Sequence, residues 1–223
     1  MPTAYLCDFD GTISPRDIGA GLVHAFSPGR DRERDALLAR WSAGGMGHRE
    51  LTIAECRLLT MREPEALAFA LRHTLDPAFA PFVEETRARG DAVMVVSEGF
   101  GFYVRALLER HGLDDLEWAA NRLVFEDDGH VRAEFPFHDP TCPTCGNCKG
   151  RHVRDWRARG YRTVLVGDGM SDRCGARAAD RVLARGALLD WCRGEGIDAR
   201  PFQSFDDVAV QERVPAPNGS GRP

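Results

Sequence analysis

The sequence predicts an α/β fold: a Rossmann-like three-layer core with a mostly parallel sheet, plus an inserted helical segment and a β-hairpin. Short apolar runs that end in turns alternate with helical patterns over most of the chain, which is typical of a parallel sheet covered by helices on both faces. Residues 14–75 contain only helical patterns, and residues 121–135 alternate around an Asp-Asp-Gly turn. The length of 223 residues suits one such core with a smaller insertion.

The predicted elements follow from local patterns, taken in chain order. A buried strand over 4–10 ends in a Gly-Thr turn, and four helices follow, separated by the breakers SPG, AGGMG and REP. These helices cover 17–26, 31–41, 48–60 and 63–73. Further along, we predict helices over 82–90, 101–112, 151–160 and 170–179, strands over 91–99 and 161–169, the hairpin over 121–135, and a last short strand over 180–185.

This order of elements predicts two structural units. The core would comprise residues 1–13 and 82–213, and the helical insertion residues 14–81. The final segment, VPAPNGSGRP (214–223), is rich in Pro and Gly, and we predict that it is disordered.

Composition argues against several classes of function. The net charge is −5 and the arginines are scattered among acidic residues, so nucleic acid is not expected as a partner. No apolar run approaches the ~20 residues that span a bilayer, and the N-terminus lacks the layout of a signal peptide. We therefore expect a cytoplasmic protein without a membrane partner, whose seven cysteines are free thiols or metal ligands.

Polar side chains gather where the predicted strands end. Three strand ends carry them: Asp8 and Asp10, Ser97 and Glu98, and Asp168 with Asp172. Ligands of parallel sheets bind at the carboxyl ends of the strands, so these groups should meet at one edge, together with a loop that carries Lys149. Lys149 is the only lysine among 29 basic residues, which indicates that a compact ammonium is needed there.

Three of these carboxylates suit a metal ion. Asp8 and Asp10 are two apart on an extended segment, so both leave the same face, and burying both without a cation is costly. Asp168 adds a carboxylate from another strand end, and ligation by oxygen alone indicates Mg²⁺. Asp172, one helical turn later, is better placed to hold a water of the metal shell, or Lys149. Alternatively, the aspartates are turn formers and helix caps, and Lys149 is an isolated surface residue.

The same groups suit phosphoryl transfer, because a carboxylate can attack phosphorus and form an aspartyl-phosphate. Charge on the phosphoryl oxygens then requires cations and hydrogen-bond donors around it. Mg²⁺, the Lys149 ammonium, the Ser97 hydroxyl and backbone amides near Glu98 and Gly99 would supply them. The groups at the predicted edge would therefore suffice for phosphoryl transfer.

Four short motifs carry a resemblance to a known family. DFDGT (8–12), VVSEG (95–99), the loop lysine and GDGMSD (167–172) resemble the motifs of the haloacid dehalogenase superfamily of aspartate-nucleophile phosphatases. The resemblance implies that Asp8 is the nucleophile and that Asp10 is the general acid and base, with its backbone carbonyl bound to the metal. It also implies phosphate contacts from Ser97 and Lys149 and a metal contact from Asp168. The helical insertion is similar to the cap of the phosphoserine-phosphatase-like branch.

A narrower resemblance lies in CGNCKG (145–150), followed by GDGMSDRCGARAAD and VLAR. These are similar to the group containing the methionine-salvage phosphatase that acts on 2-hydroxy-3-keto-5-methylthiopentenyl 1-phosphate. The implied partner is a small phosphorylated metabolite, and the oligomeric state is not predicted. Phosphoserine phosphatase, or a phosphocholine- or phosphoethanolamine-type phosphatase, is the alternative enzyme. A zinc-organised binding module without catalysis is the alternative outside enzymes.

The cysteine spacing allows a second metal. Cys142, Cys145 and Cys148 form C-x2-C-x2-C with His138 just upstream, a set that could hold Zn²⁺; alternatively, reduced thiols shape the lysine loop. The remaining cysteines are interpreted as buried small hydrophobes, namely Cys7, Cys56, Cys174 and Cys192.

Substrate choice should come from the helical insertion, because the core recognises only the phosphate. Asp17, Arg49 and Glu50 are polar candidates, which we interpret as helix caps and solvated charges. We interpret Trp41 and Phe26 as packing within the insertion.

Overall fold

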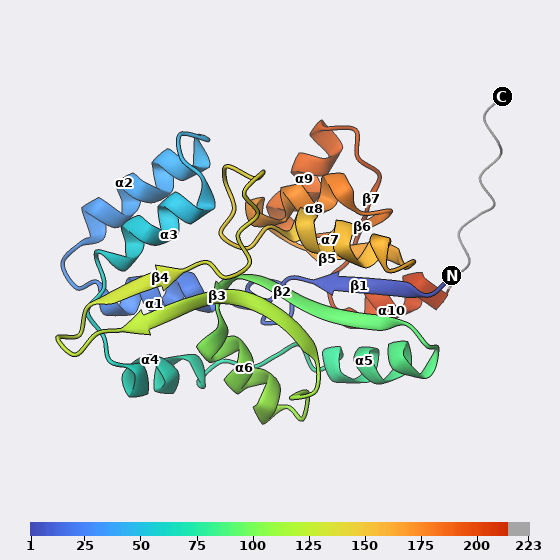
Figure 1. Ribbon diagram of the computed structural model, residues 1–223, viewed down its shortest axis with the longest axis horizontal. Helices are drawn as coiled ribbons and strands as arrows, with labels where there is room; N and C mark the ends of the chain where they lie inside the picture. The colour runs from blue at the N-terminus through green and yellow to red at the C-terminus, as the bar shows by residue number, and fades with distance from the viewer. Residues whose placement is uncertain (214–223) are drawn as a thin grey trace.

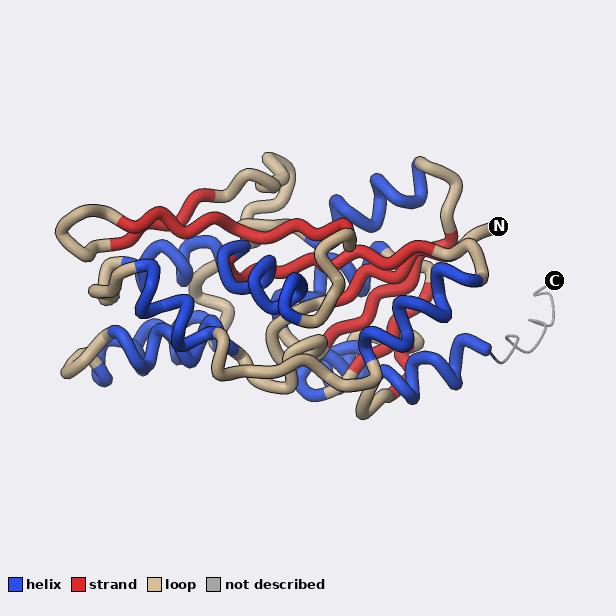
Figure 2. Tube along the Cα trace, turned by 90° about the horizontal axis from the view of Figure 1, so that it is seen from below, coloured by secondary structure: helices blue, strands red, loops and turns tan. Residues whose placement is uncertain are grey.

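The computed structural model describes residues 1–213, which form a seven-stranded sheet with helices on both faces (Figure 1; Figure 2). The strand order is β4-β3-β2-β1-β5-β6-β7, and neighbouring strands are parallel except β3 with β4. The strands are β1 (Thr3–Cys7), β2 (Ala92–Phe100), β3 (Glu117–Phe125), β4 (Val131–Glu134), β5 (Arg162–Gly167), β6 (Arg181–Ala184) and β7 (Ala199–Pro201). The predicted fold class is therefore confirmed.

Helices cover the sheet from both sides and also form the insertion after β1 (Figure 1). Those of the insertion are α1 (Ile18–Phe26), α2 (Asp31–Ser42), α3 (His48–Cys56) and α4 (Glu63–Ala70). Those that follow are α5 (Phe79–Ala88), α6 (Gly101–Arg110), α7 (Lys149–Ala158), the 3-10 helix η1 (Met170–Asp172), α8 (Arg173–Ala178), α9 (Gly186–Gly194) and α10 (Phe205–Arg213).

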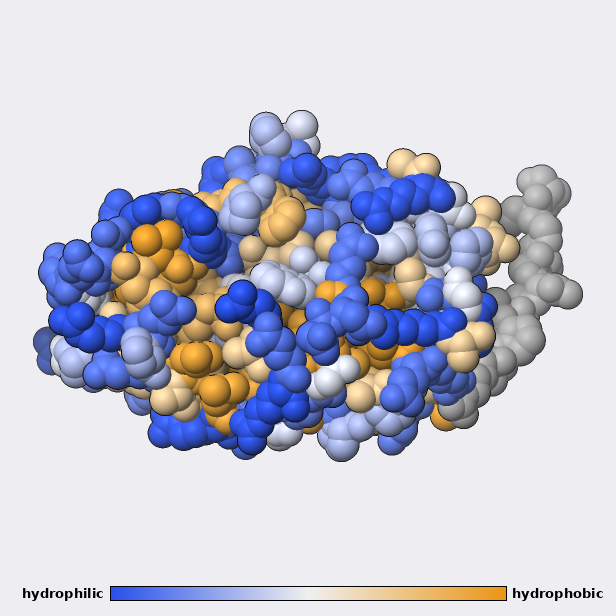
Figure 3. All heavy atoms as spheres, turned by 60° about the horizontal axis from the view of Figure 1, so that its bottom comes forward, coloured by the Kyte–Doolittle hydropathy of each residue, from blue (hydrophilic) through white to orange (hydrophobic). Residues whose placement is uncertain are grey.

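The sheet separates two apolar cores, and β1 contributes to both. Tyr5 and Cys7 face the core under α5, α6 and α10, whereas Ala4 and Leu6 face the core under α7 and α9. This alternation follows from the two-residue period of a strand, and it explains why β1 is buried on both faces from Ala4 to Cys7. Over α4, α5 and α6 the outer surface is mostly hydrophilic, with apolar side chains in patches between (Figure 3). Within residues 1–213, none of the helices combines the length and apolar character needed to cross a membrane.

The insertion contains the four helices that the breakers predict. α2 and α3 pack against each other at one end of the molecule, above the β3–β4 hairpin (Figure 1). α3 ends at Cys56, before the predicted limit of 60, and α5 begins at Phe79, within the range assigned to the insertion. The boundaries at 13/14 and 81/82 therefore stay a prediction. The segment 214–223, predicted to be disordered, lies outside the described residues.

The carboxyl-terminal part of the sheet is longer than predicted. β6 was expected to be the last strand, but α9, β7 and α10 follow it. β7 has only three residues, one of them exposed, so it offers no apolar alternation for a sequence pattern to detect.

The strand order explains where the predicted motifs meet. β1 lies between β2 and β5, so the segments that follow these three strands emerge side by side at one edge of the sheet. The backbone N–H of Asp8 still donates to Val166 O at 2.9 Å, which fixes the residue directly after β1 to the end of β5. The topology thus brings the DFDGT, VVSEG and GDGMSD segments together.

Candidate active site

A buried ion-pair cluster lies at this edge of the sheet. Lys149 begins α7 and is fully buried, and its Nζ atom lies 2.5 Å from Asp8 Oδ1 and 2.5 Å from Asp172 Oδ1. Ser171 Oγ lies 3.4 Å from the same nitrogen. Burial by itself would lower the pKa of Lys149, but Asp172 and Asp8 more than offset it and raise the pKa above its ordinary value. The ammonium is therefore charged at neutral pH.

The carboxylate of Asp8 is buried and oriented by Lys149. Burial, followed by the negative charge of Asp172, raises the pKa of Asp8, although Lys149 acts in the opposite direction. One ammonium thus does not balance the negative charge around Asp8. A further cation would be needed to balance the carboxylates around Asp8.

Asp10 points toward α1 and away from this cluster. Its Oδ1 accepts from the Ile18 backbone N–H at 2.9 Å, and its Oδ2 accepts from the Tyr103 hydroxyl at 2.6 Å. Burial, and then the charge of Asp17, raises the pKa of Asp10 to about 7. A carboxyl group with this pKa can both give and take a proton near neutral pH.

β2 extends into the site and carries the serine and glycine of VVSEG. Ser97 is fully buried; its Oγ accepts from the Gly99 backbone N–H at 2.9 Å and lies 3.4 Å from Asp10 Oδ2. Residue 99 has to be a glycine, because a Cβ atom there would lie 1.8 Å from Tyr103 Oη and 2.6 Å from Asp10 Oδ2. The close packing of these groups holds Asp10 in one orientation.

The carboxylate geometry fits a hard divalent cation. Oxygens of Asp8, Asp168 and Asp172 all lie within 4.8 Å of one another, and Asp168 Oδ1 also accepts from Thr12 Oγ1 at 2.9 Å. Burial, and then Asp172, raises the pKa of Asp168. Three carboxylates thus face the single ammonium of Lys149, and the all-oxygen donor set is the kind that Mg²⁺ prefers.

Asp172 is already engaged through both of its oxygens. Oδ1 binds Lys149, while Oδ2 accepts from the backbone N–H groups of Asp168 at 3.1 Å and Gly169 at 3.0 Å. Asp172 therefore holds the lysine and the loop that carries Asp168.

Glu98 does not turn toward the other site residues. Its Oε2 accepts from the backbone N–H groups of Gly146 at 3.0 Å and Asn147 at 3.1 Å. The sequence predicts phosphate contacts near Glu98 through the backbone. The side chain instead fixes the loop that leads to Lys149, so it acts on the position of the lysine.

A cavity of about 180 Å³ opens above these groups, between the core and the insertion. Asp8, Asp10, Ser97 and Asp168 line its floor, and α1, α2 and α3 form its walls. The wall residues are Asp17, Gly19, Ala20, Val23, Leu38, Trp41, His48, Leu51, Thr52 and Glu55. Trp41 was interpreted as packing within the insertion, but its side chain lines this cavity.

Two polar candidates of the insertion have the structural roles that the sequence favours, whereas Arg49 contacts a histidine outside the insertion. Asp17 caps α1 by accepting from the Ala20 backbone N–H at 2.8 Å, although it also lines the cavity. Glu50 is exposed and pairs with Arg40 at 3.1 Å. Arg49 Nη1 lies 2.9 Å from His138 Nδ1.

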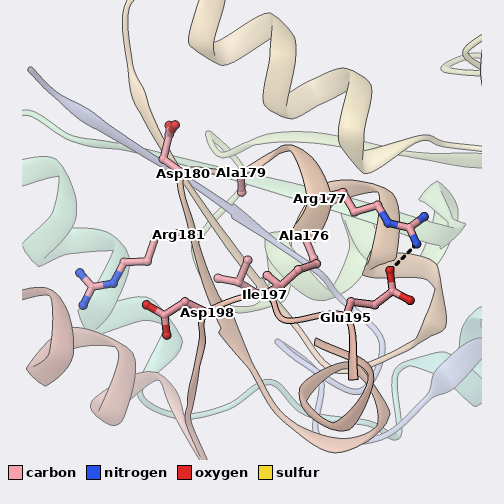
Figure 4. A pocket seen from close by; sticks show the side chains of 9 residues that line it. Ala176, Arg177, Ala179, Asp180, Arg181, Glu195, Ile197 and Asp198 are labelled. Atoms are coloured by element: carbon pink, nitrogen blue, oxygen red, sulfur yellow. Dashed lines mark hydrogen bonds and ion pairs between the residues drawn. The ribbon is translucent and has the colours of Figure 1, made fainter. Parts of the chain in front are cut away.

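A larger hollow of about 430 Å³ lies elsewhere, at the amino-terminal ends of β6 and β7 (Figure 4). Arg177 and Glu195 pair across it at 2.8 Å, and Asp180, Arg181 and Asp198 line it. It contains none of the predicted site residues, and it is at the opposite edge of the sheet from the one where ligands of such folds bind. Volume alone therefore does not locate the site.

His138 is not part of the cysteine cluster. Its ring contacts Arg49 and the Cys145 carbonyl oxygen, the latter at 3.4 Å. Cys174 of α8 instead joins Cys142, Cys145 and Cys148, with all four sulfur atoms within 4.8 Å of one another. Two interpretations from the sequence are therefore corrected. The fourth member of the cluster is the thiol of Cys174 and not His138. Cys174 is half-buried beside the other cysteines and is not an isolated buried hydrophobe. Cys7, Cys56 and Cys192 are buried, as expected.

Comparison with known proteins decides the family. The family model described as haloacid dehalogenase-like hydrolase matches residues 5–177, which include all four motifs. The chain belongs to this family. It is also similar over nearly its whole length to curated bacterial phosphatases. The phosphatase class predicted from the motifs is thus confirmed for this haloacid dehalogenase-like hydrolase.

Two of these relatives carry the name 2-hydroxy-3-keto-5-methylthiopentenyl-1-phosphate phosphatase. The protein of Exiguobacterium sp. strain AT1b is 32% identical, covering 94% of this chain and 97% of the relative. That of Geobacillus kaustophilus is 34% identical, covering 91% of each chain. A solved phosphoserine phosphatase, a phospho-aspartyl intermediate analogue, is 23% identical with a TM-score of 0.73 and covers 94% of this chain and 98% of that chain. This last likeness concerns the fold.

Sequence reasoning missed three features of this hydrolase: the contact of Tyr103 with Asp10, the role of Glu98 as a loop anchor, and the place of Cys174 beside the other cysteines. Tyr103 lies on α6, 93 residues from its partner Asp10, and no motif connects the two. Cys174 had a detectable signal, because it lies two residues after Asp172 in a motif predicted to reach the same sheet edge. Interpreting Cys174 as a buried small hydrophobe overlooked that signal.

Proposed function

We propose that the protein is a Mg²⁺-dependent phosphomonoesterase that works through an aspartyl-phosphate on Asp8. The observation that carries the proposal is the contact of Lys149 with Asp172 and with Asp8, which lies on the floor of a cavity whose walls belong to the insertion. A carboxylate oxygen of Asp8 forms a bond to phosphorus as the ester P–O bond breaks. Lys149 keeps Asp8 oriented and places positive charge beside the phosphoryl oxygens.

Asp10 is the proposed proton donor and acceptor. In the first step it gives its proton to the departing alcohol oxygen. In the second step water attacks the phosphorus of the aspartyl-phosphate, Asp10 takes a proton from that water, and inorganic phosphate and Asp8 are released. A pKa of about 7 suits both roles. Tyr103 and the Ile18 N–H keep this carboxyl away from the other carboxylates.

Asp8, Asp168 and the backbone carbonyl of Asp10 are the proposed Mg²⁺ ligands. The ion would balance the buried negative charge and polarise the phosphoryl group. Asp172 is the proposed supporting residue, because Lys149 and two backbone N–H groups already use its oxygens.

The cavity favours a substrate with an uncharged, partly apolar tail. Val23, Leu38, Trp41 and Leu51 line the walls, and none of the described residues around the cavity is Arg or Lys. The carboxylate of phosphoserine would thus find no cation there. We propose that the substrate is 2-hydroxy-3-keto-5-methylthiopentenyl 1-phosphate, the compound named for the relatives, whose thioether end suits an apolar and aromatic wall. The insertion is then a cap that selects the substrate.

One observation favours a second candidate. Asp17 and Glu55 place two carboxyl groups on the wall of the cavity that Trp41 also lines. Carboxylates and an aromatic face together suit a cationic tail, such as that of phosphocholine or phosphoethanolamine. Glu55→Gln separates the candidates, because it should raise KM for a cationic ester and change it little for an uncharged one.

The test is phosphate release from a panel of esters at saturating Mg²⁺: the methylthiopentenyl compound, phosphoserine, phosphocholine and phosphoethanolamine. The highest kcat/KM is expected for the first. A higher value for a choline or ethanolamine ester would replace the proposed substrate. No turnover of any ester by the folded, Mg²⁺-loaded protein would contradict the proposed activity itself.

A further inference from the structure

Four cysteine thiols converge beside the site from two parts of the chain. Cys142, Cys145 and Cys148 come from the loop before α7, and Cys174 comes from α8. Three of them are buried, and all four are free thiols. Their sulfur atoms all lie within 4.8 Å of one another, and Cys145 Sγ lies 3.7 Å from Cys174 Sγ. A disulfide would require about 2 Å.

This spacing matches a tetrahedron of sulfur atoms around a metal. Zn–S bonds of about 2.3 Å place neighbouring sulfur atoms of a tetrahedron about 3.7–3.8 Å apart. The observed Cys145–Cys174 distance of 3.7 Å equals such an edge. The other sulfur–sulfur distances are at most 4.8 Å. Small rotations of the side chains would therefore bring all four sulfur atoms to the distances of a tetrahedral site. Four thiols that only fill space have no reason to converge in this way.

We propose that Cys142, Cys145, Cys148 and Cys174 form a closed structural Zn²⁺ site, separate from the carboxylate site. Thiolates are soft ligands that select zinc, whereas Mg²⁺ prefers oxygen, so the two sites differ in the metal they bind. Binding converts thiols to thiolates and releases their protons to solvent. Four protein ligands leave no open position, so the ion takes no part in hydrolysis.

The site would fix two catalytic segments against each other. Cys148 directly precedes Lys149, and Cys174 follows Asp172 by two residues. Backbones approach closely here: a Cβ atom on Gly150 would lie 2.7 Å from the Cys174 carbonyl oxygen. A metal held by both segments would therefore set the position of Lys149 relative to Asp172. Its role is one of positioning.

The same loop also supports the insertion. The Arg49 backbone N–H donates to Thr144 O at 2.9 Å, so α3 begins against the residue just before Cys145. The zinc site would thus hold fixed the loop on which one wall of the cavity rests.

The first test is metal content, which does not depend on the proposed function. The protein is expressed with added zinc, purified in a reducing buffer without chelator and passed through a desalting column. We expect one zinc per chain, retained in excess Mg²⁺. Cys174→Ser and Cys142→Ser should each lose it. Matched controls should keep it: Cys192→Ala, a buried cysteine elsewhere; His138→Ala; and Asp168→Ala, which removes a carboxylate. A zinc-free wild type, iron in place of zinc, or loss of zinc in any of the three controls would overturn the assignment.

The second test covers the case in which the cysteine variants do not fold. Wild-type protein is exchanged with Co²⁺, and its absorption spectrum is recorded. Intense visible bands of tetrahedral cobalt with a strong thiolate charge-transfer band support four sulfur ligands. A weak octahedral spectrum, or one of mixed nitrogen and sulfur ligation, would contradict the site. If the cysteine variants fold, loss of zinc should displace Lys149, so we expect a lower kcat with KM nearly unchanged. An unchanged kcat in zinc-free protein would refute the positioning role.

Discussion

Lys149 and Asp172 form an ion pair at 2.5 Å in which both side chains are fully buried. A buried charge is costly unless it is paired and hydrogen-bonded, and here Asp8 and Ser171 complete the shell of the ammonium. The other 28 basic residues of the chain are arginines, so this is the one place where the chain uses an ammonium. The pair explains the exception, because the space between three oxygens suits a compact ion.

We expect Lys149→Arg to lower kcat/KM by about a hundredfold or more. The broader guanidinium cannot occupy the position of Nζ between Asp8 and Asp172 without displacing one of them. The measurement is steady-state phosphate release by folded protein. Arg105→Lys, an exposed exchange in the opposite direction, serves as the control and should leave activity unchanged. Near wild-type kcat/KM in Lys149→Arg would mean that the lone lysine has no catalytic role.

We expect Asp8→Asn to lower kcat by about 10³-fold or more while the protein stays folded, because an amide does not attack phosphorus. The check is turnover together with circular dichroism. Mass spectrometry has to show that residue 8 has not deamidated. Substantial turnover by intact Asp8→Asn protein would refute the nucleophile assignment.

We expect Asp168→Ala to raise the Mg²⁺ concentration for half-maximal activity at least about tenfold, or to abolish activity. The variant removes one of the few protein oxygens that could hold the ion, so the ion should be bound more weakly. Mg²⁺ titrations of initial rate provide the measurement. Asp190→Ala, at an exposed site, should keep the wild-type titration. Full activity of the wild type after exhaustive chelation would exclude a required metal.

The sequence predicts the location of the site well, because strand ends and motif spacing are local features. Asp8 and Asp168 directly follow β1 and β5, and Ser97 lies in the part of β2 that extends past its pairing with β1, so parallel pairing of the three strands brings these residues together. The orientation of a side chain cannot be predicted in the same way, because it depends on packing against residues that are distant in sequence. Asp10 accepts from Tyr103, and Glu98 accepts from Gly146.

The same limit explains the remaining differences. Cys174 lies on α8, far in sequence from the other three cysteines, so the packing of α8 against the lysine loop is what establishes its partners. Trp41 lies on α2, a helix with no fully buried residue, and only the tertiary structure shows that one face of this helix borders the cavity.

The cavity wall provides a prediction about pH. Burial, and then the charge of Asp17, raises the pKa of Glu55 to about 7 in the folded protein, against an ordinary value of 4.5. Between these values the folded chain binds a proton that the unfolded chain has released. Folding is thus favoured by protonated Glu55 at low pH, and this contribution is lost as pH rises through about 7.

Glu55→Gln removes this titration, so we expect it to stabilise the protein relative to wild type at pH 8 but not at pH 5. At 1.36 kcal/mol per pKa unit, and reduced for the partial exposure of the side chain, the change between the two pH values should be about 2 kcal/mol. Urea unfolding of both proteins at pH 5 and pH 8 measures it, and taking the difference cancels the groups common to both. Glu50→Gln, an exposed carboxylate on the same helix, should show no such trend. If Glu55→Gln changes the free energy of unfolding equally at both pH values, Glu55 is ionised throughout this range in the folded protein. Its ionisation would then not destabilise the fold.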